Sequence, residues 1–266
     1  MKGIRFSVIV AAAALAVGML APASDAAITS VTQNTVPNLD PLPPQIELTP
    51  LGEESFVFVD RTHELTSARY DPATGLLNTA ATGTLVGFPS YLNGVQYVAN
   101  ANDNRTAGTD AVLNDYLVTY TVDTPSFAYL LLDNRLDGTA GNVSKTNTTD
   151  PNLGGNLAWV INDGWTRVNT GMMPNGQADY LGIDEGATVA SPDLRTHHDL
   201  GPGISLNQFY AIYLKEVDGS FVTRGIRQPT GSGNMYVVAV APIPEPGTIG
   251  LVAVGVGALL ARRVRR

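Results

Sequence analysis

The chain of 266 residues carries 24 acidic and 16 basic side chains and no cysteine, which gives a formal net charge of −8 at pH 7. The lack of cysteine excludes disulfide bonds and any thiol nucleophile. The acidic balance argues against nucleic acid and anionic lipid surfaces as partners, because like charges repel.

The N-terminus has the three parts of a secretory signal peptide. Lys2 and Arg5 carry positive charge, an apolar run follows, and small residues come next. A small-x-small pattern ends both at Ala23 and at Ala26. We expect cleavage after Ala26, so residues 1–26 are the predicted signal peptide of an exported protein.

The exported part is more acidic than the whole chain. Without residues 1–26 and 242–266, the chain keeps 10 basic and 22 acidic residues, so its net charge is near −12. A domain of this charge suits divalent cations as ligands and repels nucleic acid.

After the signal peptide the sequence has the pattern of β structure. Residues 27–52 are rich in proline and predict an irregular lead-in. Residues 53–241 contain about ten short runs rich in β-branched and aromatic residues, with no run of helical period. The predicted strands cover residues 55–60, the weak region 75–87, 95–98, 116–122, 127–132, 157–161, 165–168, 180–183, 208–217, 220–223 and 234–240.

Turn-forming residues separate these runs. The turn at residues 123–126 should join the strands on either side as antiparallel neighbours. Asn162-Asp163-Gly164 predicts a hairpin, and Asp218-Gly219 joins two further strands. We therefore expect one all-β domain, an antiparallel two-sheet sandwich of jelly-roll-like form.

Acidic turns after several strands suggest a calcium site. Ca²⁺ prefers six to eight oxygen ligands, which carboxylates and amide carbonyls supply. The alternative is that these residues only form turns and stay solvated. The candidate calcium ligands are Asp103, Asp133, Asp137, Asp184 and Glu185.

The aromatic and histidine residues offer weaker candidates. Trp159 lies in an apolar run and belongs to the predicted core, whereas Trp165 follows a polar turn and is a candidate for stacking on a sugar ring. His63, His197 and His198 match no zinc motif, so we expect surface or hydrogen-bonded histidines.

The sequence contains no motif that indicates an enzyme. It has no G-x-S-x-G around a serine, and a glycosidase needs two facing carboxylates, which 22 acidic residues cannot single out. A secreted hydrolase acting on polysaccharide is the alternative to a binding or structural role.

Residues 242–266 form a tail in three parts. Pro244-Glu245-Pro246 is followed by an uncharged apolar run of 14 residues, 248–261. This run is shorter than the about 20 residues that usually cross a bilayer, although an ordinary short tail anchor is the alternative reading. An arginine cluster that fits cytoplasmic retention ends the chain: Arg262, Arg263, Arg265 and Arg266.

In this order, the tail closely resembles the PEP-CTERM sorting signal. The resemblance implies processing by an exosortase-type membrane peptidase in a Gram-negative-type bacterium, often one that makes extracellular polysaccharide. It also implies a precursor held at the inner membrane through its tail, and a product at the cell surface or outside the cell. With no catalytic motif in the domain, we expect a non-catalytic role in adhesion, matrix structure or glycan binding.

Overall fold

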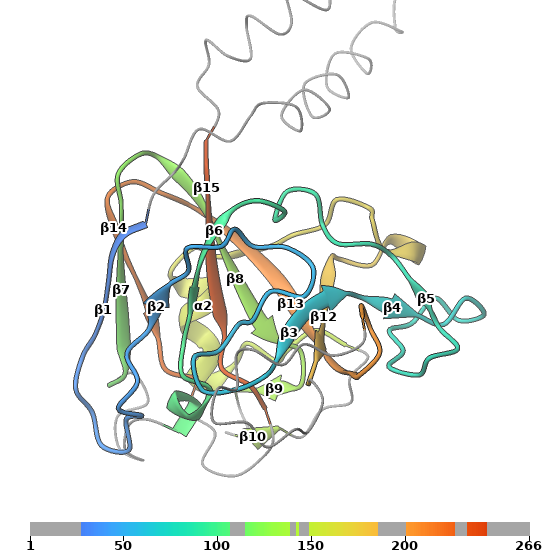
Figure 1. The fold of residues 1–266 in the computed structure, drawn as a ribbon, viewed down its shortest axis with the longest axis horizontal. Coiled ribbons are helices and arrows are strands. Elements are labelled where there is room, and N and C mark those ends of the chain that lie inside the picture. The colour runs from blue at the N-terminus through green and yellow to red at the C-terminus, as the bar shows by residue number, and fades with distance from the viewer. Residues whose placement is uncertain are drawn as a thin grey trace, which may run out of the picture.

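The computed structural model describes residues 28–106, 115–138, 142–143, 149–185, 201–226 and 233–243, and these are mostly antiparallel β structure (Figure 1). The predicted signal peptide, the tail from Pro244 onward, His197 and His198 lie outside these residues. Within the described part of the chain, no helix is long and apolar enough to cross a membrane.

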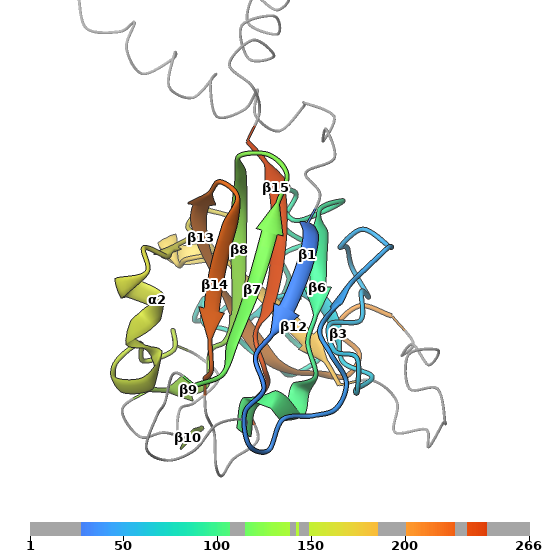
Figure 2. The ribbon, with the colours of Figure 1, turned by 90° about the vertical axis from the view of Figure 1, so that its left-hand side faces the viewer.

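The larger of the two main sheets has eight strands and curls around the core (Figures 1 and 2). Every ladder in it is antiparallel. Its strands, in spatial order, are β2 (Gln45–Ile46), β6 (Gln96–Ala99), β15 (Val237–Pro242), β8 (Ser126–Asp133), β13 (Leu206–Val217), β12 (Tyr180–Asp184) and β3 (Glu64–Ser67), and β11 (Thr166–Arg167) also pairs with β13.

A smaller sheet packs against the large one (Figure 2). Its strands, in spatial order, are β1 (Ile28–Gln33), β7 (Leu117–Val122) and β14 (Ser220–Arg224). Tyr120 stacks on Phe221 with ring centroids 4.9 Å apart, and the Thr223 hydroxyl lies 2.8 Å from the Tyr236 hydroxyl, which precedes β15. Buried residues alternate along β7, as expected for a strand with one face in the core.

The remaining elements are short and lie outside the two main sheets. They are the pair β4 (Arg69–Tyr70) and β5 (Thr84–Leu85), the pair β9 (Leu136–Asp137) and β10 (Asn142–Val143), the 3₁₀ helices η1 (Asn102–Thr106), η2 (Gly155–Leu157) and η3 (Pro174–Gly176), and the helix α2 (Ala158–Asn162). The lead-in, expected to be irregular, contains β1 and β2 and buries Leu51.

The longer predicted strands lie where the sequence placed them, but their pairing differs. Residues 116–122 and 127–132, expected as neighbours in one sheet, belong to different sheets as β7 and β8. The turn after Val122 carries the chain from the small sheet to the large one. The turn at Asp218-Gly219 carries it back, from β13 to β14.

The predicted strand at 157–161 is wrong, because this run is the helix α2 preceded by η2. Gly164 has a φ of +87° and ends the helix. Its N–H donates to Ile161 C=O at 3.0 Å, and Trp165 N–H donates to Val160 C=O at 3.0 Å. These two bonds form a Schellman cap, so Asn162-Asp163-Gly164 is a helix end and not the predicted hairpin.

The predicted strand at 55–60 is reduced to isolated bridges. Phe56 pairs with Glu64, and Phe58 pairs with Asn100. Backbone hydrogen bonds from Val57 N–H to His63 C=O and from Leu65 N–H to Ser55 C=O still hold this segment beside β3.

The two ends of the β domain differ in what they carry. At the end that we call the tail pole, Ile28 faces Val122, and Ile243 N–H donates to Pro125 C=O at 3.1 Å. The start of β1 and the end of β15 therefore lie together, at the upper end in Figure 1. The opposite end is the network pole, made by residues 60–64, 100–106, 133–137, 184–185 and 234–236.

Candidate functional site

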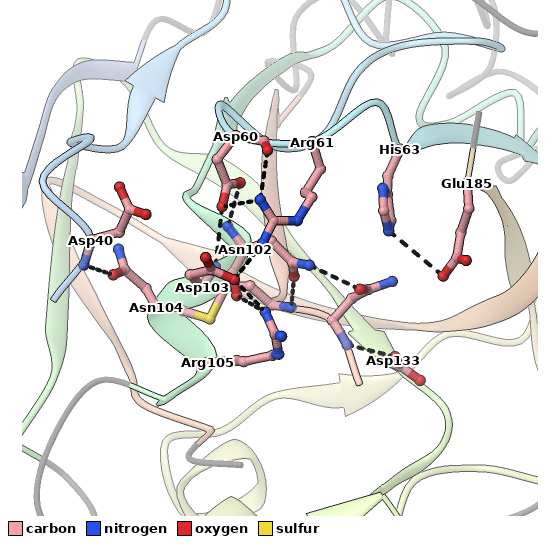
Figure 3. A network of polar contacts seen from close by, with 12 residues as sticks. Asp40, Asp60, Arg61, His63, Asn102, Asp103, Asn104, Arg105, Asp133 and Glu185 are labelled. Atoms are coloured by element: carbon pink, nitrogen blue, oxygen red, sulfur yellow. Dashed lines mark hydrogen bonds and ion pairs between the residues drawn. The ribbon is translucent and has the colours of Figure 1, made fainter. Parts of the chain in front are cut away.

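A network of polar side chains gathers at the network pole (Figure 3). Its members come from the loop before β3, from η1, from the ends of β8 and β12, and from the segment before β15. The fold thus brings together groups that are far apart in sequence.

Asp60 organises the start of η1. Its side chain is only 7 % exposed, and its Oδ1 accepts the Asn102 N–H at 2.7 Å while its Oδ2 accepts the Asp103 N–H at 3.3 Å. Burial raises the pKa of Asp60, because it disfavours the charged form, and the N–H donors and the Arg61 charge oppose this only in part.

Asp103 is a half-exposed carboxylate of the network, with 47 % of its side chain accessible. Its Oδ1 lies 2.6 Å from Arg61 Nη2 and 3.0 Å from Arg105 Nη1. Partial burial acts to raise the pKa of Asp103, but the hydrogen bonds and charges of the two arginines outweigh it and lower the pKa.

Asp40 completes a cluster of three carboxylates with Asp60 and Asp103, whose oxygens lie within 4.8 Å of one another. Such a cluster could hold a metal ion, and hard cations such as Ca²⁺ prefer oxygen ligands. Arg61 and Arg105 already supply two positive charges to this cluster. A bound cation would therefore compete with the arginines for Asp103.

Asp133, predicted as a calcium ligand, is instead a buried ion-pair partner. Arg135 binds it through Nε at 3.0 Å and Nη2 at 2.7 Å, and the Arg135 N–H adds a third bond at 2.9 Å. Its Oδ2 also accepts the Asn234 N–H at 2.8 Å. With no exposed surface and four donors, Asp133 offers no open oxygen to a metal.

The other predicted calcium ligands lie apart from the Asp40–Asp60–Asp103 cluster. Asp137 accepts a hydrogen bond from Asn152 Nδ2 at 2.9 Å. Asp184 is buried, and its Oδ2 accepts the Gly203 N–H at 2.7 Å. Of the predicted calcium ligands, Asp103 is the one that belongs to the Asp40–Asp60–Asp103 cluster.

Glu185 and His63 face each other across the ends of β12 and β3. Glu185 Oε1 lies 3.6 Å from His63 Nε2. The hydrogen bond from His63 lowers the pKa of Glu185 to about 2, since it favours the charged carboxylate.

The main-chain amides that precede β15 are bound by side chains. Asp133 accepts the Asn234 N–H, and Asn102 Oδ1 accepts the Met235 N–H at 2.7 Å. Asn102 Nδ2 also donates to Asn234 Oδ1 at 3.1 Å. The Asp60 carboxylate, through the Asn102 N–H, holds this asparagine in place.

The carbonyls of the same segment are bound as well. The Tyr210 hydroxyl donates to Met235 C=O at 2.6 Å, and Asn100 Nδ2 donates to Tyr236 C=O at 3.0 Å. All the side chains concerned are buried. We call the side chains that bind this segment the β15 anchor: Asn100, Asn102, Asp133 and Tyr210.

Trp165 does not fit the predicted glycan platform, because only 4 % of the residue is exposed. Its ring meets the Phe221 ring edge-on at 6.3 Å, and Lys215 Nζ lies 5.9 Å from its centroid. The prediction of an exposed Trp165 is wrong, since the Schellman cap turns this side chain into the core. Trp159 is buried, as predicted.

Sequence reasoning missed Asp40 and Asp60 in the cluster, and Asn100, Asn102 and Tyr210 in the β15 anchor. Asp40 lies in a proline-rich stretch that gave no local signal, and the others belong to ordinary strand and turn patterns. The sorting residues Pro244, Glu245, Pro246, Arg262, Arg263, Arg265 and Arg266 lie outside the described residues.

We compared the chain with protein families, curated proteins and solved structures. No known protein family matches the chain, and no curated protein matches it. Among solved structures, the chain is similar to a β-glucuronidase from glycoside hydrolase family 2, with a TM-score of 0.39 and 11 % identity over 76 % of this chain. The chain spans 14 % of that enzyme, and a likeness this distant supports no conclusion about activity.

Proposed function

We propose that this is an exported β-sandwich protein of the cell surface or extracellular matrix, with a non-catalytic role in adhesion, structure or glycan binding. In this proposal the sandwich is jelly-roll-like and its tail is a sorting signal cut by an exosortase-type membrane peptidase. The observation that carries it is the order of the tail: Pro244-Glu245-Pro246, an apolar run, then arginines, directly after the last strand.

The positions of the two poles support a display role. Ile243 lies at the tail pole, where its N–H donates to Pro125 C=O, and the sorting motif begins at the next residue in the sequence. A chain attached through this end would present the network pole outward. Extracellular polysaccharide is the ligand class that we propose for that face.

The burial of the carboxylates argues for binding or structure over the hydrolase alternative. A glycosidase needs two carboxylates that reach the substrate. Among the described residues of the network pole, Asp60, Asp133 and Asp184 are buried. The more exposed Asp103 is bound by two arginines, and Glu185 faces His63. The hydrolase alternative therefore has weaker support.

Mass spectrometry of surface material from the native host tests the processing. We expect the mature protein to lack residues 248–262, because the short apolar run is a poor permanent anchor. Replacing Pro244 and Pro246 with alanine should leave these residues on the protein. Replacing Pro41 and Pro43 with alanine, in the lead-in, is the matched control and should leave processing intact.

Peptides that span Thr248 to Arg262 in the mature surface protein would contradict the sorting proposal. The ligand is tested separately, on a glycan array with and without Ca²⁺. Binding that is lost when Asp103 and Arg61 are replaced would support the network pole as the glycan face.

A further inference from the structure

Strand β15 connects the interior of the domain directly to the tail. It lies between β8 and β6 in the large sheet, with Val237 to Pro242 paired to β8 and Val238 to Val240 paired to β6. Pro244, the first residue of the sorting motif, follows Ile243, the last described residue. Tension applied at Ile243, next to the end of β15, therefore enters the strand directly.

The direction of β15 decides how such tension acts. The strand runs from the network pole to the tail pole, so a pull on the tail is directed along its axis. In antiparallel ladders the hydrogen bonds run perpendicular to the strands. A pull along the axis consequently loads the bonds to β8 and β6 together, in shear, whereas a pull across the sheet would break them one after another.

The β15 anchor holds the far end of the same strand. Asp133 and Asn102 bind the Asn234 and Met235 amides, and Tyr210 and Asn100 bind the carbonyls that follow. For β15 to slide toward the tail pole, these buried bonds must break along with the ladders. Leaving such buried groups unpaired is unfavourable, because each loses its hydrogen bond and gains no water in exchange.

We propose that β15 and the β15 anchor form a mechanical clamp that resists tension applied at the C-terminal end of the β domain. In this proposal, the polar side chains of the network pole fix the start of the strand that carries the load. The inference rests on the proposed function only in that attachment through the C-terminal side supplies the tension.

Single-molecule force spectroscopy on the full chain in detergent tests the clamp. The chain has no cysteine, so two introduced thiols are its only attachment points. In the axial geometry the handles are Ile204→Cys and Gly247→Cys; Ile204 is 63 % exposed and precedes β13 at the network pole. In the peeling geometry they are Asp218→Cys, in the turn after β13 at the tail pole, and Gly247→Cys.

We expect a higher rupture force in the axial geometry, because the ladders and the anchor must yield together. Tyr210→Phe removes only the hydroxyl that binds Met235 C=O, and it should lower the axial force. It should leave the peeling force unchanged, since peeling begins at the Pro242 end of β15. Tyr213→Phe, a matched change on the same strand outside the anchor, should alter neither force.

Equal rupture forces in the two geometries would overturn the clamp, and this comparison needs no anchor variant. A fall of both forces by the same factor in Tyr210→Phe would overturn the role of the anchor, because it indicates general destabilisation. These outcomes are distinct from a failure of sorting, which appears as retained tail peptides and leaves the rupture forces as they are.

Discussion

Asp133 shows how one buried carboxylate can organise a whole end of the molecule. Arg135 neutralises it, and its remaining lone pair fixes the Asn234 amide. Asp60 acts in the same way on η1, through the Asn102 and Asp103 amides. At the residue scale, Asp60 and Asp133 bind main-chain amides, whereas the Asp103 side chain is 47 % exposed.

Replacing Arg135 with methionine should destabilise the protein strongly. The change leaves the Asp133 charge buried without its partner, and such losses cost about 3–5 kcal/mol. The free energy of unfolding in urea measures the effect. Arg224→Met is the matched control, because the Arg224–Asp163 pair is partly exposed and should contribute about 0–1 kcal/mol. Similar losses in the two variants would contradict the structural role of Asp133.

The Glu185–His63 pair predicts a dependence on acid. The pKa of Glu185 is about 2 in the folded protein, below its ordinary value of 4.5, chiefly because of the His63 hydrogen bond. A carboxylate with a lowered pKa stabilises the fold above the unfolded pKa, and this stabilisation is lost as the pH falls from about 4.5 toward 2. The melting temperature of Glu185→Gln should therefore fall less over this range than that of the unsubstituted protein.

Glu216→Gln, at an exposed glutamate of β13, is the control for this comparison. It should keep the full acid sensitivity of the unsubstituted protein. If Glu185→Gln loses as much melting temperature between pH 5 and pH 3 as this control does, the Glu185–His63 pair contributes nothing measurable.

At the scale of elements, the helix α2 illustrates the influence of tertiary packing on a short run. Ala158–Asn162 is apolar enough for a strand, yet Trp159 and Val160 are buried while Ile161 is 61 % exposed. A sequence of five residues cannot separate a strand from one helical turn by its period. The Schellman cap at Gly164 ends the turn and directs Trp165 into the core.

Replacing Gly164 with alanine should destabilise the protein by about 1–2 kcal/mol, because its φ of +87° is costly for a residue with a Cβ. An added Cβ would meet no atom within 4 Å, so the loss reports the backbone alone. Gly164→Asn should cost less, since asparagine tolerates this conformation better. Unfolding in urea measures both variants, and equal stabilities of alanine and glycine would refute the cap.

At the scale of the whole molecule, charge is the dominant feature. Residues 27–241 carry a net charge near −12, and the Asp40–Asp60–Asp103 cluster places three carboxylates together. Calcium binding stays a prediction. A bound cation would have to displace Arg61 and Arg105 from the carboxylates of the cluster. The network pole therefore combines an acidic cluster with the fixed start of β15.

Calcium should raise the melting temperature of the protein. A ligand present at a hundredfold excess over its Kd, and bound only by the folded state, adds about 2.7 kcal/mol. For a domain of this size that is a shift of roughly 2–4 °C per kcal/mol. Mg²⁺ should act less, because it demands stricter octahedral geometry. Asp40→Asn should reduce the calcium effect, whereas Asp137→Asn, outside the cluster, should leave it.

Identical melting curves in millimolar Ca²⁺ and in chelator would refute calcium binding. A calcium effect that Asp40→Asn leaves intact would place the cation elsewhere than in the cluster. Either result leaves the β15 anchor untouched, because its bonds involve amides, carbonyls and the Arg135-bound Asp133.

The sequence by itself determined the long strands. The predicted strands at 116–122, 127–132, 180–183 and 208–217 lie close to β7, β8, β12 and β13, because alternation and β-branched residues are local signals. The tail order is also a local signal, which is why the proposed sorting rests on the sequence.

Only the tertiary structure decided how these strands pair and which polar groups meet. A turn at residues 123–126 has the same composition whether its strands share a sheet or cross between two sheets. Asp40, Asp60 and Asp103 are separated by many residues and meet because the stretch before β2 and the loop before β3 both bind η1. Contacts of this kind depend on packing between distant segments, and no local pattern in the chain encodes them.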